Sequence, residues 1–187
     1  MKPLDMRDIA IIDAFPVYDC SKIVLNVGCG EGRIDFHLAE MGYRVCAVDI
    51  KRYDTWENSE SLTFHVADIF DLSSLPVSTA DVVICSQVLE HLSGYKTALV
   101  NLIALAGIRL IITVPYRASF KSPDHRNFWS DNEEGRYEDI HEFIKLGLPY
   151  SVAISKIRTK PKDAGTNKYG YLITLDKRQS FMREIEE

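Results

Sequence analysis

The sequence lacks any long uninterrupted apolar segment. Its longest apolar stretches are broken by Gly107 and Arg109 or by Asp81, well short of the roughly 20 residues that a membrane-spanning helix needs. The opening residues, MKPLDMRDIA, carry charges, and no apolar run of the kind found in secretory signals follows them. We therefore expect a cytoplasmic protein with no membrane association.

Paired cysteines are also missing. The four cysteines, at positions 20, 29, 46 and 85, include no C-x-x-C spacing. Zinc sites and redox-active pairs usually place two cysteines two residues apart. We therefore expect buried free thiols in a reducing compartment, and we predict no metal.

The chain has no excess of positive charge. Its formal net charge of −5 argues against general nucleic-acid binding, although a local basic patch remains an option. The 187 residues, 46% of them hydrophobic, suit one domain with a sizeable core. We expect a single domain over 1–187, with an N-terminal helix within 1–20, a charged tail at 176–187, and a monomer or homodimer.

What the sequence does contain is an ordered pattern between Ile23 and Asp49. Residues 23–27 form a short, mainly apolar run rich in β-branched residues, which predicts a buried strand. Glycines at alternate positions follow, namely Gly28, Gly30 and Gly32. Apolar side chains then recur at helical spacing over 34–41, and an apolar run over 44–48 predicts a second strand that ends at Asp49.

This order is one βαβ half of a nucleotide-binding sheet. Glycines let the chain turn sharply while a ligand lies against its backbone, and Asp49 suits the two hydroxyls of a ribose. The alternative is an ordinary turn of a doubly wound protein with Asp49 as a cap; we favour ligand binding because glycines and acid occur together. Arg33 stands where NAD-binding proteins carry a third glycine, which counts against NAD.

Further elements follow from apolar periodicity and breakers. Helices are predicted over 5–14, over 95–106 with Gly107 ending the helix, and over 131–146 with an acidic first turn and Gly147 at its end. Strands are predicted over 62–66, 81–85, 109–114, 150–157 and 169–175. Two polar connections remain, a loop over 116–130 and a basic hairpin loop over 158–162.

The residues at the strand ends resemble those of the class I S-adenosylmethionine-dependent methyltransferases, from about Ile23 to Pro115. VLNVGCGEG is similar to the family's first motif, ADIFDL to its adenine-contacting segment, and DVVICSQVLEHL to the motif after strand four. The resemblance is to the small-molecule subgroup, methyltransferase types 11 and 12. It implies an α/β, doubly wound, Rossmann-like sheet of seven mainly parallel strands with an antiparallel C-terminal hairpin.

The resemblance also implies S-adenosyl-L-methionine as cofactor. The residues it assigns to cofactor binding are Asn26, Gly28, Cys29, Gly30, Gly32, Asp49, Ile50, Asp68, Ile69, Ser86, Gln87 and Val88. Asp49 would hold the ribose, and Asp68 and Ile69 would contact the adenine. Asn26 departs from the acid that the family usually carries there; it keeps an acceptor oxygen for the cofactor's ammonium group but loses the charge.

The implied reaction is methyl transfer to oxygen, nitrogen or carbon of a small molecule such as a sugar or an aromatic acid. A hydroxyl acceptor must lose its proton, so His91 and His125 are candidate catalytic residues. His91 has the alternative of simply packing under the sheet. The polar-aromatic loop supplies candidate substrate residues, Tyr116, Arg117, Arg126 and Trp129, whose cations suit an anionic acceptor. The same loop has the alternative of being a lid.

Two other functions stay open. An RNA methyltransferase would use the basic segments 117–126 and 156–168 as a phosphate-binding surface. Against it, no N-P-P-Y or D-P-P-Y motif follows strand four, and no nucleic-acid-binding module is visible. A non-catalytic cofactor-binding protein is the second, because Asn26 replaces the usual acid.

Overall fold

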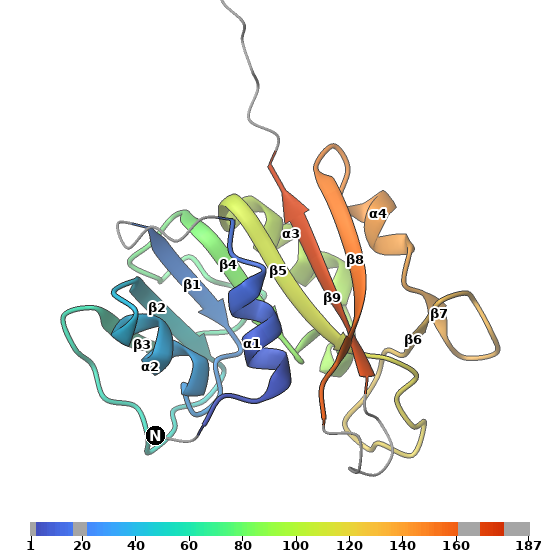
Figure 1. The fold of residues 1–187 in the computed structure, drawn as a ribbon, viewed down its shortest axis with the longest axis horizontal. Coiled ribbons are helices and arrows are strands. Elements are labelled where there is room, and N and C mark those ends of the chain that lie inside the picture. Colours follow the sequence, from blue (N-terminus) through green and yellow to red (C-terminus); the bar gives the residue numbers. More distant parts are fainter. Residues whose placement is uncertain (1–2, 17–21, 161–168, 178–187) are drawn as a thin grey trace, which may run out of the picture.

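The computed structural model describes residues 3–16, 22–160 and 169–177. Seven strands form one sheet in the order β3-β2-β1-β4-β5-β9-β8 (Figure 1). Strands β3, β2, β1, β4 and β5 are parallel, whereas β9 runs antiparallel to both β5 and β8. The predicted doubly wound sheet with an antiparallel C-terminal hairpin is therefore confirmed.

The elements have the following bounds. The sheet consists of β1 (Ile23–Val27), β2 (Arg44–Asp49), β3 (Leu62–Val66), β4 (Ala80–Ser86), β5 (Ala106–Pro115), β8 (Ser151–Arg158) and β9 (Tyr169–Asp176). The helices are α1 (Met6–Asp13), α2 (Arg33–Glu40), α3 (Tyr95–Leu105) and α4 (Glu142–Leu146), with a 3₁₀ turn η1 (Leu89–His91). Two short strands, β6 (Trp129–Ser130) and β7 (Glu138–Asp139), pair separately.

Helices cover both faces of the sheet, so its central strands are buried on both sides. Side chains of α1 and α2 pack on one face, which Val24 of β1 shares, and α3 and α4 pack on the other, which Leu25 shares (Figure 1). Strands buried on both faces carry continuous apolar runs rather than alternating ones. This explains why β1 and β4 are so uniformly hydrophobic in the sequence.

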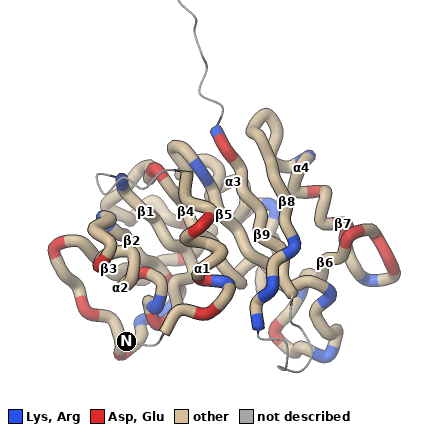
Figure 2. Tube along the Cα trace, in the orientation of Figure 1, with Lys and Arg blue, Asp and Glu red and all other residues tan. Residues whose placement is uncertain are grey.

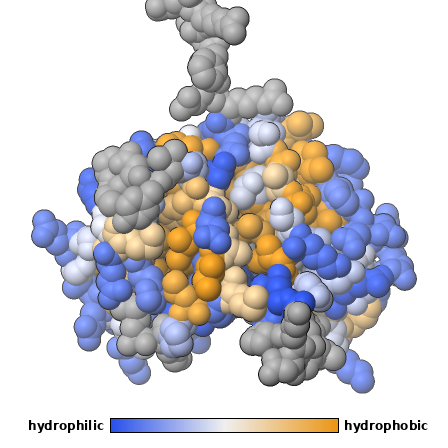
Figure 3. Space-filling view, in the orientation of Figure 1, coloured by the Kyte–Doolittle hydropathy of each residue, from blue (hydrophilic) through white to orange (hydrophobic). Residues whose placement is uncertain are grey.

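Helix α1 crosses the sheet beside the carboxyl ends of the central strands. Its start is a capping box, in which the Asp5 side chain accepts from the Asp8 N–H and the Asp8 side chain accepts from the Asp5 N–H. Ile11 is buried beneath it, whereas Met6 and Ile9 are 39% and 49% exposed. Figure 3 shows apolar surface over α1 and the part of the sheet beside it.

Two predicted helix boundaries were wrong. Residues 131–141 are not helical: Gly135 has a positive φ of 62°, and β7 pairs with β6, so only α4 remains of the predicted helix. Asp131, which we expected in the first turn of that helix, instead accepts a hydrogen bond from the Tyr171 hydroxyl at 2.7 Å. Gly107 does not end α3 but lies inside β5, because the chain passes straight from helix to strand at Ala106.

Some predictions fall partly or wholly outside the described residues. These are Cys20, the basic segment from residue 161 to 168, and the charged tail over 178–187. The described cysteines, Cys29, Cys46 and Cys85, are free thiols; Cys46 and Cys85 are buried, as predicted, whereas Cys29 is only half-buried. Among the described residues, no helix combines the length and apolar character needed to cross a membrane.

Candidate active site

A cleft of about 540 Å³ opens at the carboxyl ends of β1, β2 and β4. Open α/β sheets bind ligands at this edge, where the strand order reverses. Eight of the twelve predicted cofactor residues line it: Gly28, Gly30, Asp49, Ile50, Asp68, Ile69, Gln87 and Val88. The strand ends thus bring together segments that lie far apart in the sequence, and their binding role stays a prediction.

The glycine turn forms one wall of the cleft through its backbone. Gly28 and Cys29 both donate to the Val48 carbonyl, at 2.8 and 3.0 Å. Gly28 has a φ of +83°, and a Cβ there would lie 2.1 Å from the Cγ2 atom of Val88. At Gly30 a Cβ would meet nothing within 4 Å. Gly28 is therefore required because a side chain there would clash with Val88. Gly30 has no such neighbour, and the space beside it belongs to the cleft.

Asp49 is fixed at the tip of β2 by this turn. Its Oδ2 atom accepts from the Gly30 N–H at 2.8 Å. The Gly30 carbonyl in turn accepts from the Trp56 indole N–H at 2.8 Å, and the Trp56 ring stacks on Phe64 with centroids 5.0 Å apart. Sequence reasoning did not give Trp56 this role; its only signal was being a large apolar residue in a polar loop.

Apolar side chains form the opposite wall. Ile50 and Phe70 line the cleft although they are 63% and 44% exposed, and the neighbouring Ile69 is buried. Asp68 accepts from the Phe70 N–H at 3.0 Å, so one of its carboxylate oxygens caps the turn that follows β3. Tyr53 also lines the cleft and was not predicted. Exposed apolar side chains beside a cleft suit a flat, partly apolar ligand.

A second cavity of about 160 Å³ adjoins the cleft and shares Gly28 and Gln87 with it. The predicted residues Asn26, Cys29 and Ser86 line this cavity instead of the larger cleft, as do the cations Arg7 and Arg33. Gly32 serves instead as the N-cap of α2.

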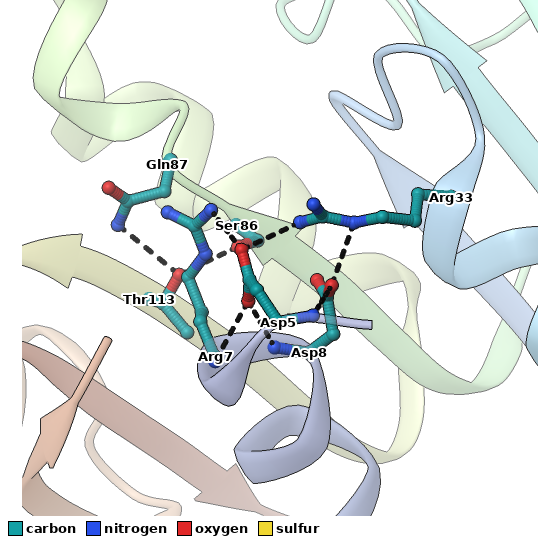
Figure 4. A network of polar contacts seen from close by, with 7 residues as sticks. All are labelled: Asp5, Arg7, Asp8, Arg33, Ser86, Gln87 and Thr113. Carbon is teal, nitrogen blue, oxygen red and sulfur yellow. Dashed lines mark hydrogen bonds and ion pairs between the residues drawn. The ribbon is translucent and has the colours of Figure 1, made fainter. Parts of the chain in front are cut away.

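Charged side chains surround this second cavity (Figure 4). Arg33 bonds Asp5 and Asp8 at 2.8 Å each, and Arg7 bonds Asp5 at 3.2 Å. Ser86 and Gln87 also line the cavity and contact the Thr113 hydroxyl at 2.7 and 3.4 Å. The cavity thus combines ion-paired arginines with neutral polar groups, and such a lining can hold a zwitterionic group.

Asn26 is held in one orientation by a buried acid. Its Nδ2 atom donates to both carboxylate oxygens of Asp35, at 2.9 and 3.0 Å. Asp35 is fully buried, and this burial raises its pKa to about 7. The Asn26 Oδ1 atom is buried and has no hydrogen-bond partner among the described residues. The amide therefore leaves its oxygen available to a donor, and its role toward an ammonium group stays a prediction.

Gln87 links the two cavities in a strained conformation. Its φ of +57° lies in the left-handed region, which residues other than glycine rarely adopt. The backbone is held there because the Gln87 N–H donates to the Thr113 carbonyl at 2.9 Å. Strained residues of this kind gather at ligand sites.

The two candidate catalytic histidines meet at the other end of the cleft. His91 lines the cleft, and its ring lies edge-on to that of His125 with centroids 5.0 Å apart. Burial lowers the pKa of His125, and the nearby His91 lowers it further. Burial also raises the pKa of Glu90, which is only 1% exposed, to about 7.

The predicted substrate residues do not line the cleft. Trp129 is 1% exposed and packs against Tyr95 and Phe143, so it is a core residue. Arg117 is ion-paired with Glu134. Tyr116 packs against Tyr171 in the sheet, and Arg126 is exposed beside His125.

An unpredicted residue fixes the loop to the cleft. The Asn127 side chain donates to the carbonyls of Leu89 and Leu92, at 2.7 and 2.6 Å. The backbone N–H groups of Arg126 and Asn127 both donate to the Glu90 carbonyl, at 2.7 and 3.1 Å. The loop after β5 is thereby tied to η1, and nothing in the sequence around Asn127 indicated this.

Comparison with known proteins agrees with this architecture. Residues 25–104 match the family model described as a methyltransferase domain. The chain is 33% identical over 107 residues to a ubiquinone biosynthesis O-methyltransferase of Rickettsia canadensis, a match over 51% of the chain and 44% of that protein. The chain thus spans less than half the length of the curated relatives it matches.

Solved structures share the fold over most of the chain. A putative S-adenosylmethionine-dependent methyltransferase from Listeria monocytogenes matches with a TM-score of 0.67 at 17% identity, covering 91% of this chain and 97% of that one. The Burkholderia thailandensis 1,6-didemethyltoxoflavin-N1-methyltransferase, solved with its substrate and S-adenosylhomocysteine, matches with a TM-score of 0.63 at 20% identity over 84% and 72%. At these identities the likeness shows the fold alone.

Proposed function

We propose that this chain, which carries a methyltransferase domain at residues 25–104 and has the class I methyltransferase fold, transfers a methyl group from S-adenosylmethionine to a small molecule. One observation carries the proposal. The glycine turn, Asp49 and the segment after β4 meet around one cleft of about 540 Å³ that joins a smaller charged cavity.

The residues present fit the cofactor part by part. Asp49 offers carboxylate oxygens to the ribose hydroxyls, and Ile50 and Phe70 offer exposed apolar surface to the adenine. The charged cavity suits the zwitterionic methionine end. Arg7, which is paired with Asp5 at the longer distance of 3.2 Å while Arg33 holds the same carboxylate at 2.8 Å, would turn to the cofactor carboxylate, and the unpartnered Oδ1 atom of Asn26 would accept from the ammonium group. The sulfonium of the bound cofactor supplies an already electrophilic methyl group.

The chain then has to position an acceptor and exclude water. The acceptor side of the cleft is the end lined by His91 and Leu92, beyond Val88. His91 is held there by η1 and by the loop that Asn127 ties down. A hydroxyl acceptor must lose its proton, and His91, which lines this end of the cleft and packs against His125, would assist that loss.

A small acceptor with a hydroxyl group fits this site best. The cleft must hold the cofactor as well, which leaves little of its volume of about 540 Å³ for an acceptor. The curated relatives are also named as O-methyltransferases. A sugar or an aromatic acid remains the class of acceptor that we favour.

RNA as the acceptor has weaker support. Lysine and arginine gather near the lower end of β8 and in the loop after β5 (Figure 2). However, Arg117 is paired with Glu134, and Lys156 lies 3.6 Å from Asp131 and over the Tyr116 ring. Cations already compensated within the chain have less to offer a phosphate backbone.

Replacing Asp49 by alanine tests the proposed function. Losing the ribose acceptor should weaken S-adenosylhomocysteine binding by about 2–4 kcal/mol in a calorimetric titration. Asp71→Ala is the matched control, because Asp71 lies beyond the cleft and bonds Ser73. If Asp49→Ala binds S-adenosylhomocysteine with the same dissociation constant as the parent, Asp49 does not bind the ribose and the proposed way of binding the cofactor is wrong.

A further inference from the structure

Three potential metal ligands converge beside the acceptor end of the cleft. They are Glu90, His91 and His125, and one ligand atom from each lies within 4.8 Å of the other two. Glu90 and His91 are neighbours in η1, whereas His125 comes from the loop after β5. We predicted no metal from the absence of cysteine pairs, but that absence bears only on cysteine-based sites, so this cluster was not foreseen.

The hydrogen bonding of His91 leaves one ring nitrogen bare. Its Nδ1 atom lies 2.9 Å from the Asp124 carbonyl. A carbonyl oxygen can only accept, so Nδ1 carries the proton and Nε2 presents its lone pair. Metal-bound histidines usually have this arrangement, in which a backbone carbonyl fixes the tautomer and the orientation of the ring.

The other two members of the cluster have buried polar atoms without partners. The Glu90 Oε2 and His125 Nδ1 atoms are buried and make no hydrogen bond within the described part of the chain. Glu90 as a whole is 1% exposed. Buried polar atoms are nearly always satisfied, and a missing ion is one reason for an exception.

We infer that Glu90, His91 and His125 form a binding site for a divalent transition-metal ion at the acceptor end of the cleft. Two imidazoles and one carboxylate suit Zn²⁺, Fe²⁺, Mn²⁺ or Co²⁺ rather than Mg²⁺ or Ca²⁺, which prefer oxygen ligands. Ligand atoms about 2.1 Å from a tetrahedral ion are about 3.4 Å apart. A small movement of the side chains would therefore bring the three atoms to this spacing.

The site deepens the proposed function and rests on it for its chemical role. Three protein ligands leave coordination positions open, and His91 lines the cleft in which the acceptor would lie. An acceptor hydroxyl bound at such a position loses its proton to solvent more readily, because the ion stabilises the alkoxide or phenolate. That oxygen then bonds to the methyl carbon as the carbon–sulfur bond breaks, releasing S-adenosylhomocysteine. The acceptor class is thereby narrowed to hydroxyl compounds that can ligate a metal, such as catechols or vicinal diols.

Cobalt binding tests the inference without any turnover. Protein freed of metal with a chelator is titrated with Co²⁺, whose visible absorption reports nitrogen and oxygen ligands, and Zn²⁺ should displace the Co²⁺. We expect one Co²⁺ per parent chain. His91→Ala and His125→Ala should each weaken binding at least about 10-fold, and Glu90→Gln, which keeps the shape of the side chain, should do the same.

His141→Ala is the matched control, because His141 also lies beside a carboxylate, that of Asp139 at 2.7 Å, but remote from the cluster in sequence and exposed. It should bind Co²⁺ like the parent. A parent that binds no Co²⁺, or variants of the cluster that bind it unchanged, would overturn the inference. A loss in His141→Ala equal to that in His91→Ala would overturn it as well.

S-adenosylhomocysteine titration of the same proteins separates the two proposals. Each cluster variant should keep its affinity for this ligand, which also shows that it is folded. If the parent binds S-adenosylhomocysteine but no Co²⁺, only the metal site is wrong. If the parent binds Co²⁺ but no S-adenosylhomocysteine, the proposed function is wrong. The metal site then remains, without a role in methyl transfer.

Discussion

The two ends of the cleft are held by different kinds of contact. At the glycine turn, backbone groups bond to the next strand, as when Gly28 and Cys29 donate to Val48. At the acceptor end, side-chain bonds add to the two backbone bonds between the loop and the Glu90 carbonyl: Asn127 bonds Leu89 and Leu92, and His91 bonds the Asp124 carbonyl. The first end is part of the folded core, and the second is a loop fastened onto it.

This difference separates stability from acceptor recognition. Changes at the turn disturb a βαβ unit on which the whole sheet depends, so they should lower both stability and cofactor affinity. Changes at the loop should move the acceptor site and leave the cofactor site intact. Loops positioned by a rigid scaffold commonly carry the variable part of a function.

The largest effect is expected from Asn26→Asp. It would place a second carboxylate against Asp35, 2.9–3.0 Å from the present amide nitrogen, in a fully buried position. An uncompensated buried charge costs about 3–5 kcal/mol of stability, measured by urea unfolding. The double variant Asn26→Asp with Asp35→Asn restores an amide–carboxylate pair and should recover most of the loss; no recovery would mean that the pair does not act as described.

Gly28→Ala should follow, with a loss of about 2–4 kcal/mol. The new Cβ would lie 2.1 Å from Val88 Cγ2 at a φ of +83°, so backbone strain adds to overpacking. Gly30→Ala is the matched control, because Gly30 also has a positive φ, +56°, but its new Cβ would meet nothing within 4 Å. It should lose only the cost of the left-handed backbone, about 1–2 kcal/mol, and bind S-adenosylhomocysteine more weakly, since its methyl group occupies the ligand's space. Equal stability losses in both variants would contradict the division of roles within the turn.

A smaller effect at the same end depends on pH. Burial raises the pKa of Asp35 from 3.8 to about 7, so the folded protein keeps a proton that the unfolded chain loses. The resulting stability is complete below about pH 4 and is lost as pH rises through 7. Between pH 5 and 8 the parent should lose about 2–3 kcal/mol more than Asp35→Asn. Parallel profiles from urea unfolding would show that Asp35 is ionised throughout.

The smallest effect on stability is expected at the loop. Asn127→Ala leaves the Leu89 and Leu92 carbonyls without their shared donor and should cost about 1–2 kcal/mol. Once an acceptor is known, its KM should rise while S-adenosylhomocysteine affinity stays that of the parent. A rise in KM together with a fall in S-adenosylhomocysteine affinity would show that the two ends of the cleft are coupled, and this would contradict the comparison.

The cofactor end was predictable because its signals are local and repeated. Strand, glycine turn and Asp49 occur in order, and the parallel topology brings the strand ends to one edge. The acceptor end was not, because its contacts depend on tertiary partners. Asp131 had the composition of a helix start, but the Tyr171 hydroxyl holds it in a loop, and Trp129 sits in the core instead of the cleft.

Tertiary contacts also explain why the predicted site residues are divided between two cavities. Asn26 and Ser86 are at the expected strand ends but face the smaller charged cavity, which α1 completes. Side chains alternate along a strand, so neighbouring residues at one strand end need not enter the same cavity. The convergence of Glu90 and His125 required the path of a long loop, and no spacing in the sequence encodes it.

Titrating the parent chain with S-adenosylhomocysteine tests the central claim most directly, because every role assigned to the cleft requires that this ligand binds there. Calorimetry should show one site per chain and a higher melting temperature with the ligand present, as expected for a ligand that binds only the folded state. NAD should produce neither change. Heat and stabilisation from NAD instead of S-adenosylhomocysteine, or from neither ligand, would contradict the account.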